Sequence, residues 1–262
     1  MPAVYAHYTF GRQVLAQLSP SIQQLLTRSP LHKQLFAVGL QGPGILFFYR
    51  PYPNRLSRQG GEIHEKPAAD FLRPLLEGLD PSEEEDELLL CYLLGFTCHF
   101  ALDSQCHPYI ARRLTQADVT HHQIESEFDR MLMEEHGKDP LRFNPACYLH
   151  PDEDQCRIIA RAYPELTPRH IRQCMNGWLI LRDLLTSRSG ARRAVLGGAT
   201  RAVGLGGLVL PALPSPRCLA SNRELRWLYD TAVGEAASLV GAVYRTAHSG
   251  APLPVRFQRN FE

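Results

Sequence analysis

The sequence predicts an all-α fold, an expectation that rests on three observations. Helix-capping signals recur along the chain, and runs with apolar residues at helical spacing follow them. Alternating runs are scarce, and "ILFFYRPY" is the one stretch that could form a strand. We therefore expect a single-domain multi-helix bundle over residues 1–262, with long loops near 40–65 and 188–220.

The clearest helix signal is the stretch "LDPSEEEDELLLCYLLGFTCHFALDSQCH". Asp80 is placed to cap this helix, Pro81 suits the first helical position, and Glu83 completes a capping box. The residues over 88–102 are apolar on nearly every side, which is typical of a helix surrounded by protein. Because Pro108 would clash with the preceding turn of a regular helix, we expect this helix to end near His107.

Further helices are predicted from start and stop signals. The longer ones run from Thr120 to Gly137, from Thr167-Pro168 to about Leu185, and from Ser221 to just before Gly250. Shorter helices are expected over residues 4–17, 20–28, 66–78 and 152–163.

Composition and charge exclude several classes of protein. The 28 Lys and Arg against 27 Asp and Glu leave a formal net charge of +1, too balanced to hold duplex nucleic acid by bulk electrostatics. The 7 cysteines are an odd number without a C-x-x-C pair, which argues against a disulfide scaffold or a thiolate zinc site. The opening "MPAVYAHYTFGRQVL" lacks the features of a secretory signal, so we expect a cytoplasmic location. No apolar run of about 18 residues predicts a transmembrane segment.

The second expected loop contains "RRAVLGGATRAVGLGGLVL", which mixes arginines with apolar residues. It is the candidate for peripheral membrane contact. Its glycines disfavour a stable amphipathic helix, and we expect a mobile lid or loop instead.

Groups able to bind metal recur within the long apolar helix and the helix that follows. His99 and Asp103 are four residues apart and therefore share a helix face, while His107 lies one turn further on. Burying such groups costs roughly 2–7 kcal/mol each unless a partner satisfies them. His121 and Glu125 repeat the spacing at the start of the next helix. Together with His107, they form a donor set typical of zinc.

Alternative readings apply to each of these residues. A lone histidine on an apolar helix is more often a hydrogen-bonded core residue than a ligand, but two H-x-x-x-[DE] pairs with His107 between them favour metal binding. His122 is a second choice to His121, because it precedes Glu125 by three residues and lies on another face. Cys98 and Cys106 do not share the ligand face, so we interpret them as packing residues.

These motifs resemble those of the bacterial zinc-dependent phospholipase C family, in particular its intracellular members without a signal sequence. The resemblance rests on "YAHYTFG", "LQGPGILFF", "EIHEKPA", "GFTCHFALDSQCHPY", "HHQIESEFDRML" and "RFQRNFE". It extends over essentially the whole chain and is strongest over residues 1–135. The resemblance implies an all-α bundle that holds zinc and hydrolyses a phosphodiester or phospholipid.

The resemblance also implies which residues hold the ions. It assigns His64 and His99 to one zinc, His107, His121 and Glu125 to another, and His7 with the N-terminal residue to a third, with Asp103 bridging two ions. We expect two zinc ions, with a third possible. The carboxylates Asp103 and Glu125 are the candidate catalytic residues, and the neighbours Glu62 and Glu65 could orient His64.

Two departures from the family pattern leave the function open. The chain begins Met1-Pro2 instead of with the tryptophan of the secreted members, which weakens the case for the third zinc. Gly44 stands where the family has an aspartate that serves as ligand and proposed general base. The alternatives to a hydrolase are therefore a catalytically impaired metal-binding or interaction protein, and a helical domain without metal. A single-strand nuclease is less favoured, because no aromatic and basic groove is evident.

Overall fold

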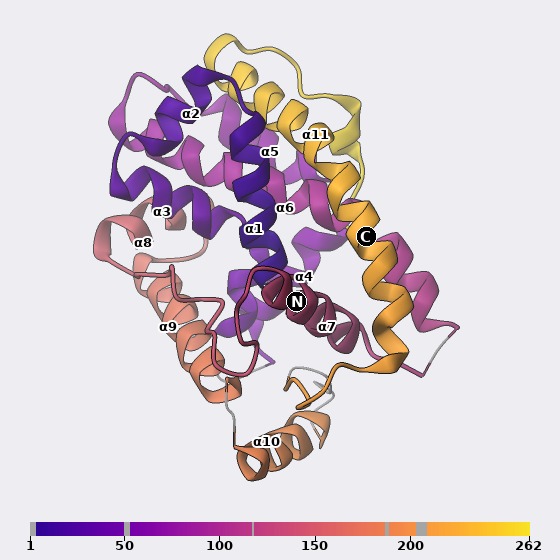
Figure 1. Ribbon diagram of the computed structural model, residues 1–262. Coiled ribbons are helices and arrows are strands. Elements are labelled where there is room, and N and C mark those ends of the chain that lie inside the picture. The colour runs from indigo at the N-terminus through magenta and orange to yellow at the C-terminus, as the bar shows by residue number, and fades with distance from the viewer. Residues whose placement is uncertain (1–3, 50–52, 117, 187–188, 203–208) are drawn as a thin grey trace.

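The computed structural model describes residues 4–49, 53–116, 118–186, 189–202 and 209–262, and these residues form helices and connecting segments without a strand (Figure 1). The expected all-α fold is confirmed. The elements are α1 (Val4–Gln17), α2 (Pro20–Thr27), α3 (Pro30–Gly39), η1 (Gly42–Phe48), α4 (Arg55–Glu65), α5 (Ala68–Glu77), α6 (Glu84–Leu114), α7 (His121–Glu135), α8 (Glu153–Arg161), α9 (Pro168–Leu185), α10 (Gly190–Ala202), η2 (Pro216–Cys218), α11 (Leu219–Ser249) and η3 (Val255–Gln258).

Helix α6 is the centre of the bundle, with α3 on one side and α11 on the other (Figure 1). Nearly every residue from Leu88 to Ser104 is buried, as the apolar sequence predicted. α6 approaches α3 closely because Gly39 and Gly95 face each other, where a side chain on either would collide with the opposite backbone. Among the described residues α6 alone has the length and hydropathy to cross a membrane, and 94% of that window is buried inside the protein.

Helix α6 does not end near His107, as the sequence had suggested, but continues through Pro108 to Leu114. Proline has no N–H, so the carbonyl of Ser104 lacks its usual donor in the helix. The structure supplies another: Nη2 of Arg259 lies 3.5 Å from that carbonyl oxygen and donates to it. The expected break is therefore accommodated within a continuous helix.

The start of α6 also differs from the prediction. Asp80 does not cap the helix, because its carboxylate accepts hydrogen bonds from the backbone N–H and hydroxyl of Ser82. The helix begins four residues later, at Glu84. In contrast, Thr167 caps α9 with a capping box, and Gly250 ends α11 in the left-handed conformation with φ 68°, both at the predicted positions.

The long loops expected near 40–65 and 188–220 contain helices. Residues 42–48 form the 3₁₀ helix η1, so "ILFF" is not a strand, and Asn54 caps α4 with Ser57 in a capping box that sequence analysis missed. In the second region α10 forms despite its glycines, and Ser189 accepts a hydrogen bond from the N–H of Arg192 at its start. Residues 50–52, 187–188 and 203–208 of these regions lie outside the described part of the chain.

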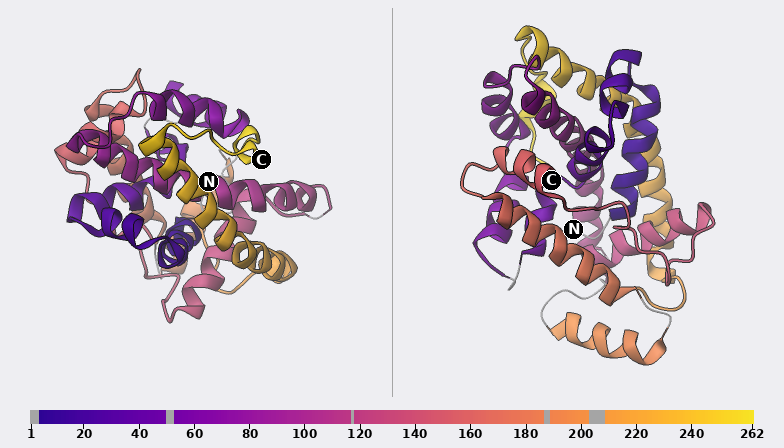
Figure 2. Two further views of the ribbon diagram at one scale, coloured as in Figure 1. Left: turned by 90° about the horizontal axis from the view of Figure 1, so that it is seen from above. Right: turned by 90° about the vertical axis from the view of Figure 1, so that its left-hand side faces the viewer.

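The candidate ligands lie where four helices meet. The start of α1, the end of α4 and the start of α7 converge on the second half of α6. α10 lies apart from this bundle, at the far end of α9 (Figure 2). The ligands predicted from the sequence are therefore carried by the bundle and not by α10.

Candidate metal centre

Two groups of candidate ligands lie along one face of α6. His7, His99 and Asp103 form the first group, and the ligand atoms of these three residues lie within 4.8 Å of one another. The second group meets the same criterion and consists of His107 from α6 with His121 and Glu125 from α7. Within the described residues, the structure thus brings together side chains from α1, α6 and α7 that are far apart in sequence.

The first group is buried and centred on Asp103. Nε2 of His7 lies 3.1 Å from Oδ1 of this carboxylate, and Nε2 of His99 lies 3.1 Å from Oδ2. His64, from the last turn of α4, joins them: its Nε2 lies 3.3 Å from Nε2 of His99 and 3.8 Å from Oδ2 of Asp103. All four residues are buried.

The second group is nearer to solvent. Oε1 of Glu125 lies 3.2 Å from Nε2 of His121 and 3.6 Å from Nε2 of His107. Glu125 is buried, but the side chain of His121 is 35% exposed. This side of the centre is therefore the one that solvent reaches.

Hydrogen bonding fixes the orientation of His64. Its Nδ1 donates to the carbonyl of Gly60 at 2.7 Å, which leaves Nε2 to face the first group. Such a bond to the distal nitrogen is the usual way in which proteins orient metal-binding imidazoles. The expected partners Glu62 and Glu65 are exposed and do not fill this role.

The charges of the first group are set by burial and by neighbouring ionisable groups. Burial would raise the pKa of Asp103, but the imidazoles of His107, His99 and His7 outweigh it and hold that pKa well below its usual range. Burial lowers the pKa of His64 to about 4 and that of His99 well below its usual value. Neutral imidazoles with an ionised carboxylate are the protonation states that metal binding requires.

His107 differs from the other imidazoles. Burial lowers its pKa, but the carboxylates of Asp103 and Glu125 act in the opposite direction and raise the pKa to about 9. Without a bound cation, His107 is therefore the group that carries a positive charge between the two carboxylates. A divalent cation in the second group would take the place of this proton.

The donor set fits zinc. Oδ2 of Asp103 is buried and accepts no hydrogen bond, although an ionised oxygen in such a place needs a compensating positive partner. Imidazole nitrogens and carboxylate oxygens are ordinary zinc ligands. The residues present could hold one cation in each group, with Asp103 reaching both.

Residues 6–179 match the family described as zinc dependent phospholipase C. This span covers well over half of the chain and includes every candidate side-chain ligand. The chain belongs to the zinc-dependent phospholipase C family. No curated protein and no solved structure matches the chain.

Gly44, where the sequence resemblance leads us to expect an aspartate, has a well-defined place in this member of the zinc-dependent phospholipase C family. Gly44 is buried in η1, and its N–H donates to the carbonyl of Gln41. A glycine supplies no carboxylate to the centre. The proposed third ion would also need the N-terminal residue, which lies outside the described residues.

Sequence analysis missed Asp129, a residue that supports the candidate centre. Its two carboxylate oxygens accept hydrogen bonds from the N–H groups of Tyr5, at 3.1 Å, and Ala6, at 2.8 Å. These bonds tie the start of α1, and hence His7, to α7. Asp129 follows Glu125 by four residues and so shares its helix face, which is a signal that could have identified it.

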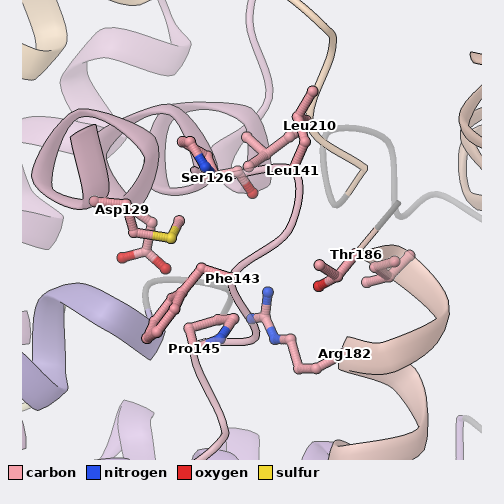
Figure 3. A pocket seen from close by; sticks show the side chains of 11 residues that line it. Ser126, Asp129, Leu141, Phe143, Pro145, Arg182, Thr186 and Leu210 are labelled. Atoms are coloured by element: carbon pink, nitrogen blue, oxygen red, sulfur yellow. The ribbon is translucent and has the colours of Figure 1, made fainter. Parts of the chain in front are cut away.

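Asp129 shares a pocket with Arg182 of α9, and the side chains of both point into it (Figure 3). Arg182 is buried, and burial lowers its pKa while the negative charge of Asp129 opposes this shift. Burial also raises the pKa of Asp129 to about 7, against the opposing effects of Arg182 and the two N–H groups. Asp129 is therefore placed between this pocket and the start of α1, whose N–H groups it binds.

Gly42 is a second residue that sequence analysis missed. Its φ is +53°, a conformation that favours glycine, and a Cβ at this position would lie only 2.0 Å from Cδ2 of His99. The backbone of η1 thus lies directly against a candidate ligand. Gly42 stands in "QGPG", two residues before Gly44, so the motif itself was visible in the sequence but not the contact.

Proposed function

We propose that this protein is a metal-dependent phosphodiester hydrolase of the phospholipase C type that uses a dinuclear or trinuclear zinc centre. The observation that carries the proposal is the position of Asp103, whose Oδ1 lies 3.1 Å from His7 and 3.5 Å from His107, between the two ligand groups. A carboxylate placed in this way can serve two cations. Zinc, when bound, polarises a phosphoryl oxygen and lowers the pKa of water.

The chain's own residues would contribute in distinct ways. Asp103 and Glu125 are ionised and buried, so they neutralise cation charge, and Asp103 sets the spacing of the two groups. The first group excludes water, and the exposed side of His121 leaves room for a phosphodiester. We expect two zinc ions, one in each group, and a third ion would need His7 to bind together with the N-terminal residue instead of within the first group.

The second candidate function is a catalytically impaired metal-binding or interaction protein. It is favoured by Gly44, because its buried position in η1 has no carboxylate to bind metal or accept a proton from water. The two candidates share the metal centre and differ only in turnover.

Metal content and hydrolysis distinguish these proposals. The zinc content of protein purified without added metal is measured by elemental analysis, and hydrolysis is followed with a chromogenic phosphodiester and with dispersed phosphatidylcholine, each with and without chelator. A hydrolase binds at least two zinc ions and loses turnover with chelator. Zinc without turnover supports the impaired protein, and a gain of activity in Gly44→Asp would show that the lost carboxylate is the cause. A chain that binds no zinc contradicts both.

A lipid substrate calls for contact with a membrane surface, and α10 is the element we propose for it. Its outward residues are small and apolar, with the side chain of Val195 exposed by 72%, and Arg192 is also exposed. Between Asp183 and Glu224 the sequence has no acidic residue. The basic residues there are Arg188, Arg192, Arg193, Arg201, Arg217 and Arg223. Apolar and basic residues in one segment favour an anionic lipid surface.

Co-sedimentation with vesicles tests this contact. We expect the wild-type chain to bind vesicles of phosphatidylcholine with phosphatidylglycerol more strongly than vesicles of phosphatidylcholine alone. Each basic residue near an anionic surface contributes about 1 kcal/mol, so Arg192→Glu with Arg193→Glu should weaken binding at least tenfold. Lys33→Glu with Arg73→Glu, a charge-matched pair of exposed residues elsewhere, is the control. Equal loss in the two pairs would contradict a role for α10.

A further inference from the structure

We propose that residues 254–262 act as a strap that holds His64 against α6, with Phe261 as the positioning residue for the imidazoles of His64 and His99. The inference rests on the proposed metal centre in one respect, namely what His64 binds. The strap lies outside residues 6–179, the span matched to the family.

The strap is attached to the end of α4, where His64 is located. The N–H of Phe261 donates to the carbonyl of His64 at 3.1 Å, and the side-chain amide of Asn260 donates to the carbonyl of Glu65 at 3.4 Å. The N–H of Ala68, at the start of α5, donates to the carbonyl of Arg259 at 3.0 Å. The strap therefore binds the carbonyl and amide groups that the end of one helix and the start of the next leave without helical partners.

The same strap is attached to α6 beside Asp103. Nη2 of Arg256 donates to Oγ of Ser104 at 2.9 Å, and Nη2 of Arg259 donates to the carbonyl of Ser104 at 3.5 Å. That carbonyl is the one left without its helical donor by Pro108. Strap, α4 and α6 are thus joined around the first ligand group.

Phe261 fills the space behind the imidazoles. It is fully buried, with its ring centroid 5.2 Å from that of His64 and 5.8 Å from that of His99. Phe96 and Phe100 of α6 pack on the same ring, at 5.7 and 5.2 Å. His64 lies in the last turn of α4, and its bond to Gly60 orients the imidazole relative to that helix but does not attach the end of the helix to α6. The strap supplies the missing constraint, through the Phe261 ring on the side chain and the Phe261 N–H on the backbone.

The same segment offers a matched control. Phe257 is also fully buried and stacks on Phe100, with centroids 5.3 Å apart, and within the described part of the chain its ring does not contact a histidine ring. Phe257→Ala and Phe261→Ala therefore remove the same ring from the same strap. Both should lower the stability of the protein, and the loss of a buried Phe typically costs about 3–5 kcal/mol. Only Phe261→Ala should change the positions of His64 and His99.

The test measures zinc affinity by competition with a chromophoric chelator, in the full chain, together with thermal unfolding. We expect Phe261→Ala to weaken one of the two zinc sites by about 10–100-fold, as loss of an orienting residue does, and to spare the other. Phe257→Ala should destabilise the chain but keep both affinities. Phe261→Leu, which retains most of the buried apolar volume, should fold. Its zinc affinity should lie between those of Phe261→Ala and Phe257→Ala.

A double variant shows whether Phe261 acts through His64. In a His64→Gln background the further loss of affinity caused by Phe261→Ala should be several-fold smaller than in the wild-type background. The proposed role of the strap would be wrong if Phe261→Ala lowered zinc affinity equally in the two backgrounds, or if Phe257→Ala and Phe261→Ala lowered it equally. Either result would leave the proposed function intact. A wild-type chain that binds zinc but has no turnover still supports the strap if Phe261→Ala alone weakens binding. A wild-type chain without zinc would overturn both proposals.

Discussion

Oδ1 of Asp103 lies 3.5 Å from Nε2 of His107, one turn further along α6, and this contact joins the two ligand groups. The same carboxylate lies 3.1 Å from Nε2 of His99, one turn earlier, through Oδ2. A single side chain therefore contacts candidate ligands on both sides of it along the helix.

Replacing this carboxylate should affect both groups at once. Asp103→Asn keeps the shape of the side chain but removes its negative charge, so we expect the zinc content to fall in both groups. Glu125→Gln should affect mainly the second group, because Oε1 of Glu125 lies 3.2 Å from Nε2 of His121 and 3.6 Å from Nε2 of His107, both in that group. Elemental analysis of the two variants checks this difference. Retention of both zinc ions in Asp103→Asn would contradict the bridging position.

Zinc binding should release a proton from His107 at neutral pH. Because its pKa is raised to about 9, the metal-free chain holds this proton at pH 7, and zinc has to displace it. The apparent affinity of the second group should rise about tenfold per pH unit from pH 6.5 to 8. Calorimetric titration in two buffers with different ionisation heats counts the released protons. His107→Gln should lack this release, and a wild-type chain that released none would contradict the protonation state.

The same pKa predicts how the metal-free protein responds to pH. A group whose folded-state pKa is raised stabilises the fold fully below its unfolded value, here about 6.5, and the contribution is lost as the pH rises through about 9. Metal-free wild-type protein should therefore lose stability over that window relative to His107→Gln. Denaturant unfolding at pH 6 and pH 9 checks the direction.

Gly42 should not tolerate a side chain. Gly42→Ala places a methyl group 2.0 Å from the imidazole of His99 in a left-handed backbone conformation, and overpacking of this kind typically costs about 1–3 kcal/mol. The left-handed conformation adds roughly 1–2 kcal/mol. We expect lower stability together with weaker zinc binding. Gly61→Ala, in α4 with no atom within 4 Å of its Cβ, is the control and should be neutral or slightly stabilising. Similar behaviour of the two variants would contradict the contact.

Replacing Asp129 should lower both the stability of the protein and its affinity for zinc, although Asp129 is not itself a candidate ligand. Asp129→Ala leaves the N–H groups of Tyr5 and Ala6 without their acceptors in a buried place, at a cost of about 1–3 kcal/mol for each unsatisfied group. Chemical denaturation measures the loss, and zinc affinity reports on His7. Asp70→Ala, an exposed residue in the first turn of α5, should cost much less. Equal losses in the two variants would show that Asp129 does not anchor α1.

Much of the fold could be predicted from local signals. Thr167 with Pro168 and Gly250 determine helix ends through their own backbone and neighbouring residues, so the sequence identifies them directly. The ligands on α6 and α7 were also visible, because four-residue spacing is a property of one helix. Local rules failed at Pro108, where a residue distant in sequence, Arg259, supplies the missing donor.

The parts of the centre that sequence analysis missed depend on contacts between distant segments. Asp129 binds the start of α1, 123 and 124 positions away, and Phe261 packs against His64 from the other end of the chain. The four-residue spacing from Glu125 shows which face Asp129 occupies, but no periodic pattern reveals either of these contacts with a distant segment. The helix α10 was missed for another reason, since its glycines lower intrinsic helix propensity without preventing helix formation.

Because α6 continues without a break through Pro108, regular helical geometry determines the spacing of the candidate ligands along it. His99, Asp103 and His107 lie on successive turns, so the spacing between cations bound there would be determined by helical pitch, about 6 Å for each four residues. Inserting one residue between Asp103 and His107 would rotate His107 about the helix axis by about 100° relative to Asp103. The distance between the bound cations would therefore depend on the backbone hydrogen bonds of α6 and not on the conformation of a loop.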